Sequence, residues 1–430
     1  MRIIHTSDLS PRDKAKLMMR SQAVILEYVD KVRHIVEDVR ERGDEAIVKH
    51  VEKLDGVKLS LDRLEVSDED FKRAEEKISP SLLRAMKHAI ENLRRFHREQ
   101  LPKKMWFTEV EEGIHVGLQA SPLARVGLYI PAGKGKFPSV VPMLGVPAKV
   151  AGVKEVILCT PPVDGFGDPA TLVAAKLLGI DRVFRVGGVP AIAAMAFGTQ
   201  TIPRVDKIVG PGGPYVSAAK ILVRDHVALG TPAGPSEVMV LADESADPRI
   251  AAAEILSETE HGPDSPGILV TTSRRVAEEV SREIEALLPL IPEWRRGFAV
   301  EALGKYGAII VCKDMEEAIE FINEYSPEHL LILTADPLGI CVRVRSAGAV
   351  FLGPYSSVSA GCYLTGSNAI LPTGGSGKAY SATTVYDFLR FQCVEFVDVK
   401  GLKHVLEDLE VYADYEGFPA HKLAARIRFP

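Results

Sequence analysis

The sequence predicts an α/β protein in which two parallel-sheet domains lie side by side, with a helical segment before them and a small tail after them. From residue 125 onward, short β-branched runs alternate with Ala-rich stretches of helical spacing, which is the pattern of parallel βα units. This alternation runs once to about residue 235 and is then repeated to about residue 365. A chain of 430 residues is long enough for such domains to have well-buried cores.

Residues 1–124 are predicted to form a helical N-terminal region. Val32, Ile35 and Val36 belong to a set of apolar residues that recur at about 3.6-residue spacing, and similar periodicity returns over residues 82–96. The first residues carry no basic-then-apolar signal, and no apolar run reaches the roughly 18 residues that a membrane helix needs. We therefore expect neither a targeting segment nor a membrane span.

Residues 125–235 are predicted to form the first incomplete Rossmann-like α/β domain. Its expected strands are 126–130, 155–159, 182–186 and 207–209, and its expected helices are 137–151, 169–178, 190–197 and 215–223. A G-x-G-x-x-G fingerprint after the first strand is absent from the sequence. Two glycine turns, at 187–188 and 210–213, stand between a strand and a helix, so their N–H groups suit a phosphate. Ordinary tight βα turns explain the same glycines.

Residues 236–365 are predicted to form the second incomplete Rossmann-like domain, and residues 366–430 a C-terminal tail. The expected strands of the domain are 238–241, 267–271, 307–311, 330–333 and 349–351, and its expected helices are 248–260, 274–288, 315–324 and 337–346. The tail offers a Gly- and Ser-rich stretch, one β-like segment at 383–396 and one helix at 402–416. It is too small to carry its own core, so it must pack on something else.

Composition and charge favour a small-molecule partner. The formal net charge of −6 gives no electrostatic footprint for nucleic acid or an anionic membrane. The five cysteines are odd in number, widely spaced and free of any C-x-x-C pair, so neither a disulfide framework nor a zinc ribbon is indicated. We expect a protein of the reduced cytoplasm.

Two carboxylate–imidazole pairs are the strongest candidates for chemistry. His261 follows Glu258 by three residues near the end of a predicted helix, so both side chains can reach one metal ion or one substrate. A solvated ion pair explains the same spacing. Glu328 and His329 directly precede a buried strand, where desolvation can tune both pKa values for proton transfer. A capping carboxylate beside a partly buried histidine is the alternative reading.

Ordered motifs run through essentially the whole chain. They include Gly127-Leu128-Tyr129-Ile130-Pro131, Gly234-Pro235-Ser236-Glu237, Glu260-His261-Gly262-Pro263-Asp264, Pro327-Glu328-His329 and Leu371-Pro372-Thr373. In order and density they resemble the motifs of the histidinol dehydrogenase family. The resemblance implies an enzyme that oxidises an alcohol through an aldehyde to an acid, with two NAD+ and a bound zinc ion.

The resemblance also implies roles for single residues. Glu328 becomes the base that activates water, and His329 becomes the acceptor of the alcohol proton. The implied zinc ligands are Glu258, His261, Cys362 and His421, with Glu258 and Cys362 replacing a glutamine and an aspartate of the family. The implied substrate-binding set is Ser236, Glu258, His261, His329, Cys362, Glu416 and His421, and the implied cofactor-binding positions are Tyr129, Pro190 and Gly213.

The C-terminal tail carries two of these positions, Glu416 and His421. The family brings this tail to the active site of the neighbouring subunit, so the resemblance implies an intertwined homodimer with exchanged tails. Pro190 and Gly213 replace a glutamine and an asparagine of the family at the cofactor positions.

Around the substrate, Val358 stands where the family usually has a glutamate and Ala369 where it has a histidine. Losing such interactions typically weakens binding by about 1.5–3 kcal/mol each. Three hypotheses follow: a zinc- and NAD-dependent dehydrogenase acting on L-histidinol or a close relative, a family member redirected to another small alcohol, and a non-catalytic relative. The intact acid–base pair favours the first, the changes at 358 and 369 the second, and the changed cofactor positions the third.

Overall fold

The computed structural model describes residues 1–20, 25–133, 135–163 and 165–429. The chain divides into two compact units. The first comprises Met1–Gln100 and Ala124–Phe388, and the second comprises Leu101–Leu123 and Leu389–Pro430. Among the helices of the described residues, none has the length and apolar character needed to cross a bilayer.

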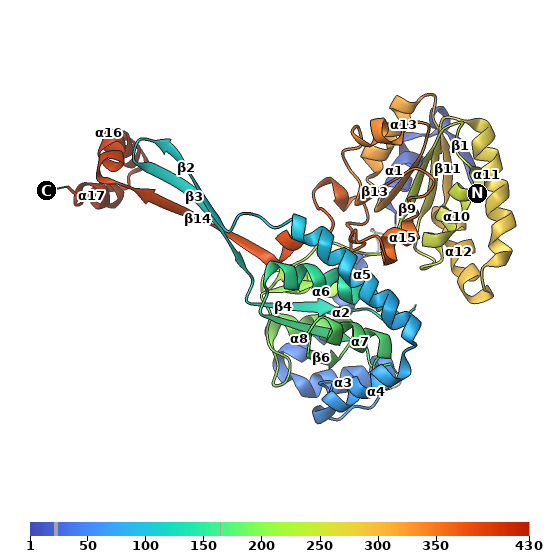
Figure 1. Cartoon of the computed structure of the whole chain (residues 1–430), viewed down its shortest axis with the longest axis horizontal. Helices are drawn as coiled ribbons and strands as arrows, with labels where there is room; N and C mark the ends of the chain where they lie inside the picture. The colour runs from blue at the N-terminus through green and yellow to red at the C-terminus, as the bar shows by residue number, and fades with distance from the viewer. Residues whose placement is uncertain (21–24, 134, 164, 430) are drawn as a thin grey trace. The chain divides into compact units, whose positions relative to one another are not determined.

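The first α/β half is a five-stranded parallel sheet in the order β6-β5-β4-β7-β8 (Figure 1). Its strands are β4 (Arg125–Tyr129), β5 (Glu155–Thr160), β6 (Arg182–Arg185), β7 (Lys207–Val209) and β8 (Ala228–Leu229). Its own helices are α6 (Val140–Ala151), α7 (Pro169–Leu177), α8 (Gly188–Phe197) and α9 (Pro214–Val223). N-terminal helices add an outer layer, with α2 (Ile25–Arg42) and α3 (Asp44–Asp55) on α8 and α9, α4 (Asp68–Lys77) on α7, and α5 (Pro80–Glu99) on α6.

The second α/β half is a six-stranded parallel sheet in the order β1-β11-β10-β9-β12-β13. Its strands are β1 (Arg2–His5), β9 (Val238–Ala242), β10 (Gly267–Thr271), β11 (Ala308–Val311), β12 (His329–Leu333) and β13 (Ala349–Leu352). The helices of this half are α1 (Pro11–Met19), α10 (Pro248–Thr259), α11 (Arg274–Leu287), α12 (Glu293–Tyr306), α13 (Met315–Tyr325), α14 (Pro337–Cys341) and α15 (Val358–Tyr363). Helices α10, α11 and α12 build the core on one face, and α13, α14 and α1 that on the other.

The prediction of two parallel α/β halves is confirmed. Every residue of β9, β10 and β12 is buried, as expected for parallel strands that helices cover on both faces. The structure also contains short 3-10 helices, which are η1 (Thr6–Asp8), η3 (Leu61–Arg63), η4 (Leu288–Leu290), η5 (Ser376–Lys378) and η6 (Val385–Phe388).

Several expected elements are wrong in detail. The N-terminal region is not wholly helical, because β1 pairs with β11 about 300 residues later, a partner that local periodicity cannot reveal. Helix α12 was not expected, and the helix expected over 337–346 ends at Cys341. The segment 105–122, expected within the helical region, forms a strand pair instead.

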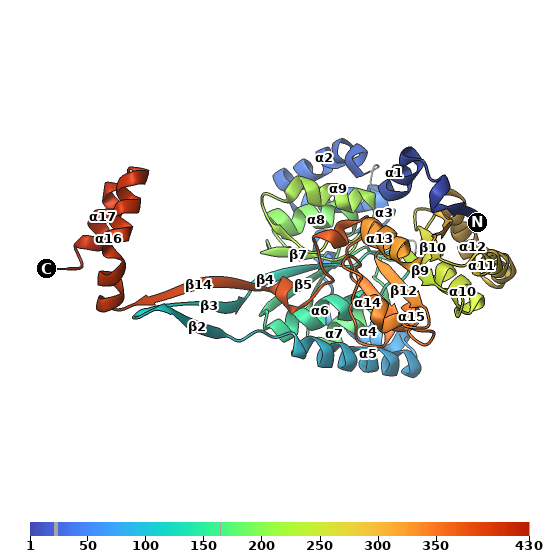
Figure 2. The same ribbon diagram turned by 90° about the horizontal axis from the view of Figure 1, so that it is seen from above.

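The second unit contains an antiparallel sheet in the order β14-β3-β2, and Figure 2 shows these strands as a long ribbon. Its elements are β2 (Met105–Glu111), β3 (Ile114–Pro122), β14 (Leu389–Val397), α16 (Val399–Glu416) and α17 (Pro419–Arg426). Every residue of β2 is exposed, and in α16 and α17 only Gly401, Ala413 and Ala425 are buried. The division of the chain at residues 124, 235 and 365 stays a prediction.

Candidate active site

A cavity of about 610 Å³ in the first unit is lined by residues of both α/β halves. From the first half come Tyr129, at the end of β4, and Pro211, which follows β7. From the second half come Glu258, near the end of α10, and Glu328 and His329, at the start of β12. The carboxyl edge of one sheet therefore shares this cavity with the amino edge of the other.

The edge of the first sheet has the geometry of a dinucleotide site. Strand order reverses between β4 and β7, and ligands of open parallel sheets bind outside the carboxyl ends at such a reversal. Gly210 has φ +131°, and a Cβ there would lie 2.1 Å from the Tyr129 carbonyl oxygen, so only glycine lets the chain pass so close to β4. Gly213 then caps α9, and it lines the cavity.

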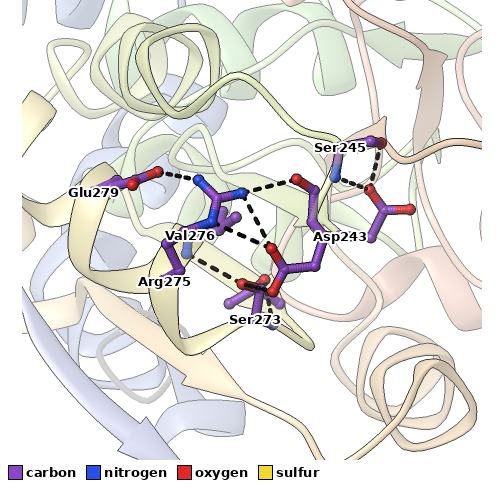
Figure 3. Close-up of polar contacts among 8 residues, drawn as sticks. Asp243, Ser245, Ser273, Arg275, Val276 and Glu279 are labelled. Carbon is purple, nitrogen blue, oxygen red and sulfur yellow. Dashed lines mark hydrogen bonds and ion pairs between the residues drawn. The ribbon is translucent and has the colours of Figure 1, made fainter.

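At the corresponding edge of the second sheet, polar side chains that follow β9 and β10 bind one another and nearby N–H groups (Figure 3). Asp243 follows β9 and accepts hydrogen bonds from the N–H groups of Ser245 and Ala335, both at 2.9 Å. Arg275 donates to the Glu244 carboxylate at 3.1 Å, and Ser273 donates to the same carboxylate at 2.5 Å. The N–H groups of Ser245 and Ala335 at this edge therefore already have a carboxylate partner.

The two predicted catalytic residues are buried and face each other. The Oε2 atom of Glu328 lies 3.4 Å from Nδ1 of His329, and their side chains are 6% and 3% exposed. The backbone of Glu237 contacts both residues: its N–H donates to Glu328 Oε2 at 2.7 Å, and its carbonyl oxygen lies 3.0 Å from His329 Nδ1. The pair is therefore held as a unit.

The contacts of His329 indicate its tautomer and favour its charged form. A carbonyl oxygen only accepts, so Nδ1 carries a proton towards Glu237, and Nε2, which lies 3.9 Å from Cys362 Sγ, remains for a second proton. Burial opposes the charged imidazolium, but the nearby Glu328 and Glu258 carboxylates outweigh it and hold the pKa of His329 well above its usual value.

Glu258, His261 and Cys362 line the same cavity. The Oε2 atom of Glu258 lies 3.7 Å from Nε2 of His261, just beyond the end of α10, and 4.0 Å from His329 Nδ1. The ring of His261 stacks on that of Phe137, with centroids 6.4 Å apart. Burial raises the pKa of the Glu258 carboxyl and that of the Cys362 thiol, and the His329 imidazole opposes both shifts.

These three side chains partly fit the predicted zinc site. A carboxylate, an imidazole and a thiol are all side chains that zinc accepts as ligands. Within the described ranges of the chain, however, no three His, Cys, Asp or Glu side chains are gathered closely enough to hold a metal ion. The fourth predicted ligand, His421, lies in α17 of the second unit.

The remaining predicted positions fall in different places. Ser236 lines the cavity, as do Tyr129 and Gly213. Pro190 is buried within α8. The first residue of that helix, Gly188, donates its N–H to the Tyr129 hydroxyl at 3.2 Å. Glu416 ends α16, so it belongs with His421 to the second unit.

The two departures from the family pattern differ in their surroundings. Ala369 lines the cavity, whereas Val358 is fully buried in the core beside β9 and α10. The Val358 N–H donates to the buried Glu254 carboxylate at 3.1 Å. A ligand in the cavity can therefore contact position 369, where alanine replaces a polar side chain. Position 358 is part of the core and does not line the cavity.

The cavity is acidic. Four carboxylate side chains line it, those of Glu258, Glu260, Asp264 and Glu328. Among the described residues that line it, neither lysine nor arginine occurs. All four carboxylates come from the second half, so that side of the cavity favours a cationic group over an anionic one.

Two buried residues near the catalytic pair were missed by the sequence analysis. Glu237 stands in one of the quoted motifs, next to Ser236, but no role followed from its position. Arg20 lies 3.1 Å from the Glu237 carboxylate, although 217 residues separate them. No local sequence pattern predicts the contact between Arg20 and Glu237. The one available signal was that Glu237 directly follows the predicted substrate-binding residue Ser236.

The chain is similar to known proteins over nearly its whole length. The family model described as histidinol dehydrogenase matches residues 18–429. Histidinol dehydrogenase of Synechocystis is 42% identical over 428 residues, covering 99% of each chain, and that of Methanosarcina barkeri is 44% identical, covering 98% of this chain and 96% of its own. The crystal structure of histidinol dehydrogenase from Elizabethkingia anophelis superposes with a TM-score of 0.92 at 35% identity, covering 100% of this chain and 98% of its own.

Proposed function

The chain belongs to the histidinol dehydrogenase family of oxidoreductases, and we propose that it oxidises L-histidinol through the aldehyde to L-histidine, a step of histidine biosynthesis. One observation carries the proposal. The buried Glu328 and His329 face the same cavity as the carboxyl end of a parallel sheet at its change of strand order. The pair can transfer protons, and the sheet edge suits a dinucleotide.

The proposed reaction assigns one proton transfer to each catalytic residue. His329 takes the alcohol proton at Nε2, since Nδ1 is engaged with the Glu237 carbonyl. Glu328 then takes a proton from the water that attacks the aldehyde, and the Glu237 N–H holds its carboxylate in place. Oxidation of an alcohol to an acid removes two hydrides and adds one water oxygen, so two NAD+ are reduced for each alcohol.

We propose that NAD binds at the edge of the first sheet and accepts the hydrides there. Tyr129 and Gly213, both predicted cofactor positions, line the cavity at this edge. Pro190, the third predicted position, lies in α8, which contacts the Tyr129 hydroxyl through the Gly188 N–H. The N-terminus of α9, where Gly213, Tyr215 and Val216 line the cavity, suits the pyrophosphate.

We propose that Glu258, His261 and Cys362 bind zinc together with His421 of the partner subunit. Their shared position in the cavity supports the proposal. Zinc at this point would polarise the substrate hydroxyl as a Lewis acid. Two anionic and two neutral ligands would leave the site formally uncharged, and the cysteine would favour zinc over magnesium or manganese.

The acidic cavity supports histidinol as the substrate. At neutral pH, histidinol carries an ammonium group beside its hydroxyl, and beyond the zinc ligand Glu258 the described lining offers Glu260, Asp264 and Glu328 without a lysine or arginine. An alcohol that carries a phosphate or sulfonate would meet repulsion there. Ser236 can hydrogen-bond the amino or hydroxyl group, while Ala369 leaves space where the family has an imidazole.

We propose a homodimer with exchanged tails. In the second unit many large apolar side chains are exposed, among them Trp106, Phe107, Phe396, Tyr415 and Leu423. Such a surface is unfavourable in water and suits contact with another chain. A neighbour's tail would place its Glu416 and His421 near the cavity.

We further propose a cytoplasmic enzyme with no nucleic-acid or membrane partner. All five cysteines are unpaired, and Cys159 and Cys312 are buried, which fits a reducing compartment. The formal net charge of −6 agrees with a small-molecule substrate.

A panel of alcohols tests the proposal. Protein of measured zinc content is supplied with NAD+ and with L-histidinol, with a neutral analogue that lacks the amino group, or with an anionic alcohol, and NADH is followed by absorbance. We expect turnover on L-histidinol and little on the anionic alcohol. NADH formation only with another alcohol would show that the enzyme acts on a different substrate. No NADH formation with any alcohol, together with no binding of the dinucleotide, would show a non-catalytic relative.

A further inference from the structure

Arg20 is a buried arginine at the end of helix α1, outside both sheets. Its side chain is 1% exposed, and its backbone has φ +51°, a left-handed conformation that residues other than glycine rarely adopt. Such a conformation persists only where surrounding contacts enforce it. The contacts of the guanidinium group are therefore the feature to explain.

The Arg20 guanidinium bridges two segments that are far apart in sequence. Its Nη1 atom lies 3.1 Å from Oε2 of Glu237, directly before β9. Its Nη2 atom donates to the carbonyl oxygens of Tyr325 and of Ser326, the latter at 3.3 Å. The guanidinium carbon also lies 3.5 Å from the centroid of the Tyr325 ring. One side chain thus connects the approach to β9 with the approach to β12.

These two segments carry the catalytic pair. Glu237 donates its N–H to Glu328 and accepts at its carbonyl from His329 Nδ1, at 2.7 and 3.0 Å. Its own side chain accepts from the Gly374 N–H at 2.7 Å. A shift of the Glu237 backbone therefore moves the hydrogen-bond partners of both reacting side chains at once.

We propose that Arg20 is a positioning residue for the Glu328–His329 pair, acting through Glu237 and the carbonyls of Tyr325 and Ser326. It does not line the cavity of the catalytic pair, so it contacts no reacting group. The reaction assigned to the pair is the proposed function, on which this role rests. The positioning itself is a structural property that can be measured without substrate.

A purely structural role is the alternative, since any buried ion pair can stabilise a fold. Arg185 provides the matched comparison. It is fully buried, pairs with Asp70 and donates to the carbonyls of Arg63 and Phe166 at 2.7 and 2.8 Å, but it lies in β6. Both arginines thus bind one carboxylate and two or more carbonyls, and only Arg20 is connected to the catalytic pair.

The test compares Arg20→Met with Arg185→Met in the full-length protein. Labelling the histidines with ¹⁵N makes the His329 Nδ1–H signal visible by NMR, and His329→Asn assigns it. We expect Arg20→Met to shift this signal or to broaden it by exchange with water, and Arg185→Met to leave it unchanged. In turnover assays, Arg20→Met should lower kcat by about 10- to 100-fold with KM changed less than about threefold, because a misplacement near 1 Å costs that much.

Unaltered His329 resonance in a folded Arg20→Met protein would overturn the proposal, whatever its turnover. If that variant does not fold, Arg20→Lys decides, because lysine keeps the charge beside Glu237 but loses the fork that holds two carbonyls. It should shift the same signal, and an unshifted signal would again overturn the role. If the wild-type protein makes no NADH from histidinol, the proposed function fails, and the imidazole signal still decides whether Arg20 positions the pair.

Discussion

Burial changes the pKa values of single acidic residues in and beside the cavity. Glu237, Glu258 and Glu328 are all nearly inaccessible to water, and burial raises the pKa of Glu237 to about 7 against the opposing charge of Arg20. Glu328 and Glu258 in turn stabilise a proton on His329. Burial and neighbouring charge thus shift the pKa values of the acidic and basic groups around the catalytic pair, which is how proteins tune side chains for proton transfer.

Removal of either reacting side chain should abolish most turnover. Glu328→Gln keeps the size of the side chain, and His329→Asn keeps a side-chain N–H donor close to the position of Nδ1, but neither new side chain can take up a proton. We expect kcat to fall by about 10²–10⁴-fold, the usual contribution of positioned proton transfer, with the melting temperature little changed. His88→Asn, at an exposed position of α5, is the matched control and should be as active as the wild type. Wild-type rates in either active-site variant would refute the assignment.

The pH dependence follows from the raised pKa of His329. As acceptor of the alcohol proton, the imidazole must be neutral, so kcat/KM should fall as pH drops through its pKa. Because the Glu328 and Glu258 carboxylates raise that pKa, the midpoint should lie above about 6.5, the value of an unperturbed histidine. A profile of kcat/KM from pH 5 to pH 10 measures it. A midpoint below the ordinary histidine value would show that another group controls the reaction.

At this scale the sequence singled out Glu328 and His329, which the structure places together in the cavity, and missed the residues that hold them. Glu328 and His329 were predictable because a charged pair stood directly before an apolar strand. Their contacts with Glu237 depend on the pairing of β12 with β9, where His329 lies opposite Val238. That register spans about 90 residues of sequence and is set by packing, which a local pattern does not contain.

At the scale of elements, helix α5 holds one wall of the cavity. Its buried His97 accepts at Nε2 from the Asn368 amide at 3.2 Å, and Asn368 also donates to the Met143 carbonyl at 2.6 Å. Asn368 accepts in turn from the Ile370 N–H at 2.9 Å. Since Ala369 and Ile370 line the cavity, this network fixes the shape of the wall.

Asn368→Ala should therefore affect both stability and substrate binding. The substitution leaves His97 Nε2 and the Met143 carbonyl without this donor, and each unsatisfied buried group costs about 1–3 kcal/mol. We expect a lower urea midpoint together with a raised KM for the alcohol. Asn323→Ala is the control, since Asn323 bonds the backbone at Arg343 and Arg345 away from the cavity. A loss of stability in Asn368→Ala with wild-type KM would contradict the role in shaping the wall.

The helices and strands that were predicted correctly are those whose formation depends on nearby residues in the sequence. Strands β7 and β10 begin and end where predicted, because each is a β-branched run bounded by turn residues. Strand β1 was missed because its partner β11 lies near the other end of the unit. Helix α12 has charged and apolar residues around its whole surface and so lacks the apolar stripe that would predict it.

At the scale of the whole molecule, the proposed homodimer assigns the C-terminal tail of each chain to the cavity of its partner. Within the second unit, Glu416 and His421 are exposed and the β-ribbon buries few of its own side chains. A dimer with exchanged tails accounts for both facts. In that arrangement, the residues of one active site come from two chains.

Mixing two inactive variants tests the exchange. Glu328→Gln, in the first unit, should be inactive through loss of the base, and His421→Ala, in the second unit, should be inactive through loss of zinc. Co-expressed, half of the dimers are mixed, and each mixed dimer regenerates one intact site, so activity should return to roughly a quarter of the wild-type level. If the tail serves its own chain, every site keeps one defect and no activity returns. Separately prepared variants, mixed without subunit exchange, are the control.

Metal content gives an independent check on the same arrangement. Protein purified without chelator should hold close to one zinc per chain, and Cys362→Ala and His421→Ala should each lower that value. Cys393→Ala, which changes an exposed cysteine of β14, is the matched control and should retain zinc. Less than roughly a tenth of an equivalent in the wild type, even after zinc is supplied, would mean that the predicted ligands do not form a site.

The most direct test of the account is the stoichiometry of NADH formation from a limiting amount of L-histidinol, followed to completion with the product identified by mass. Oxidation through the aldehyde to the acid in the cavity of Glu328 and His329 predicts two NADH for each histidinol consumed, with L-histidine as the product. The Glu328→Gln protein should not complete the second oxidation, because it lacks the base that activates water. Absence of NADH, or one NADH with the aldehyde as the final product of the wild-type protein, would contradict the account.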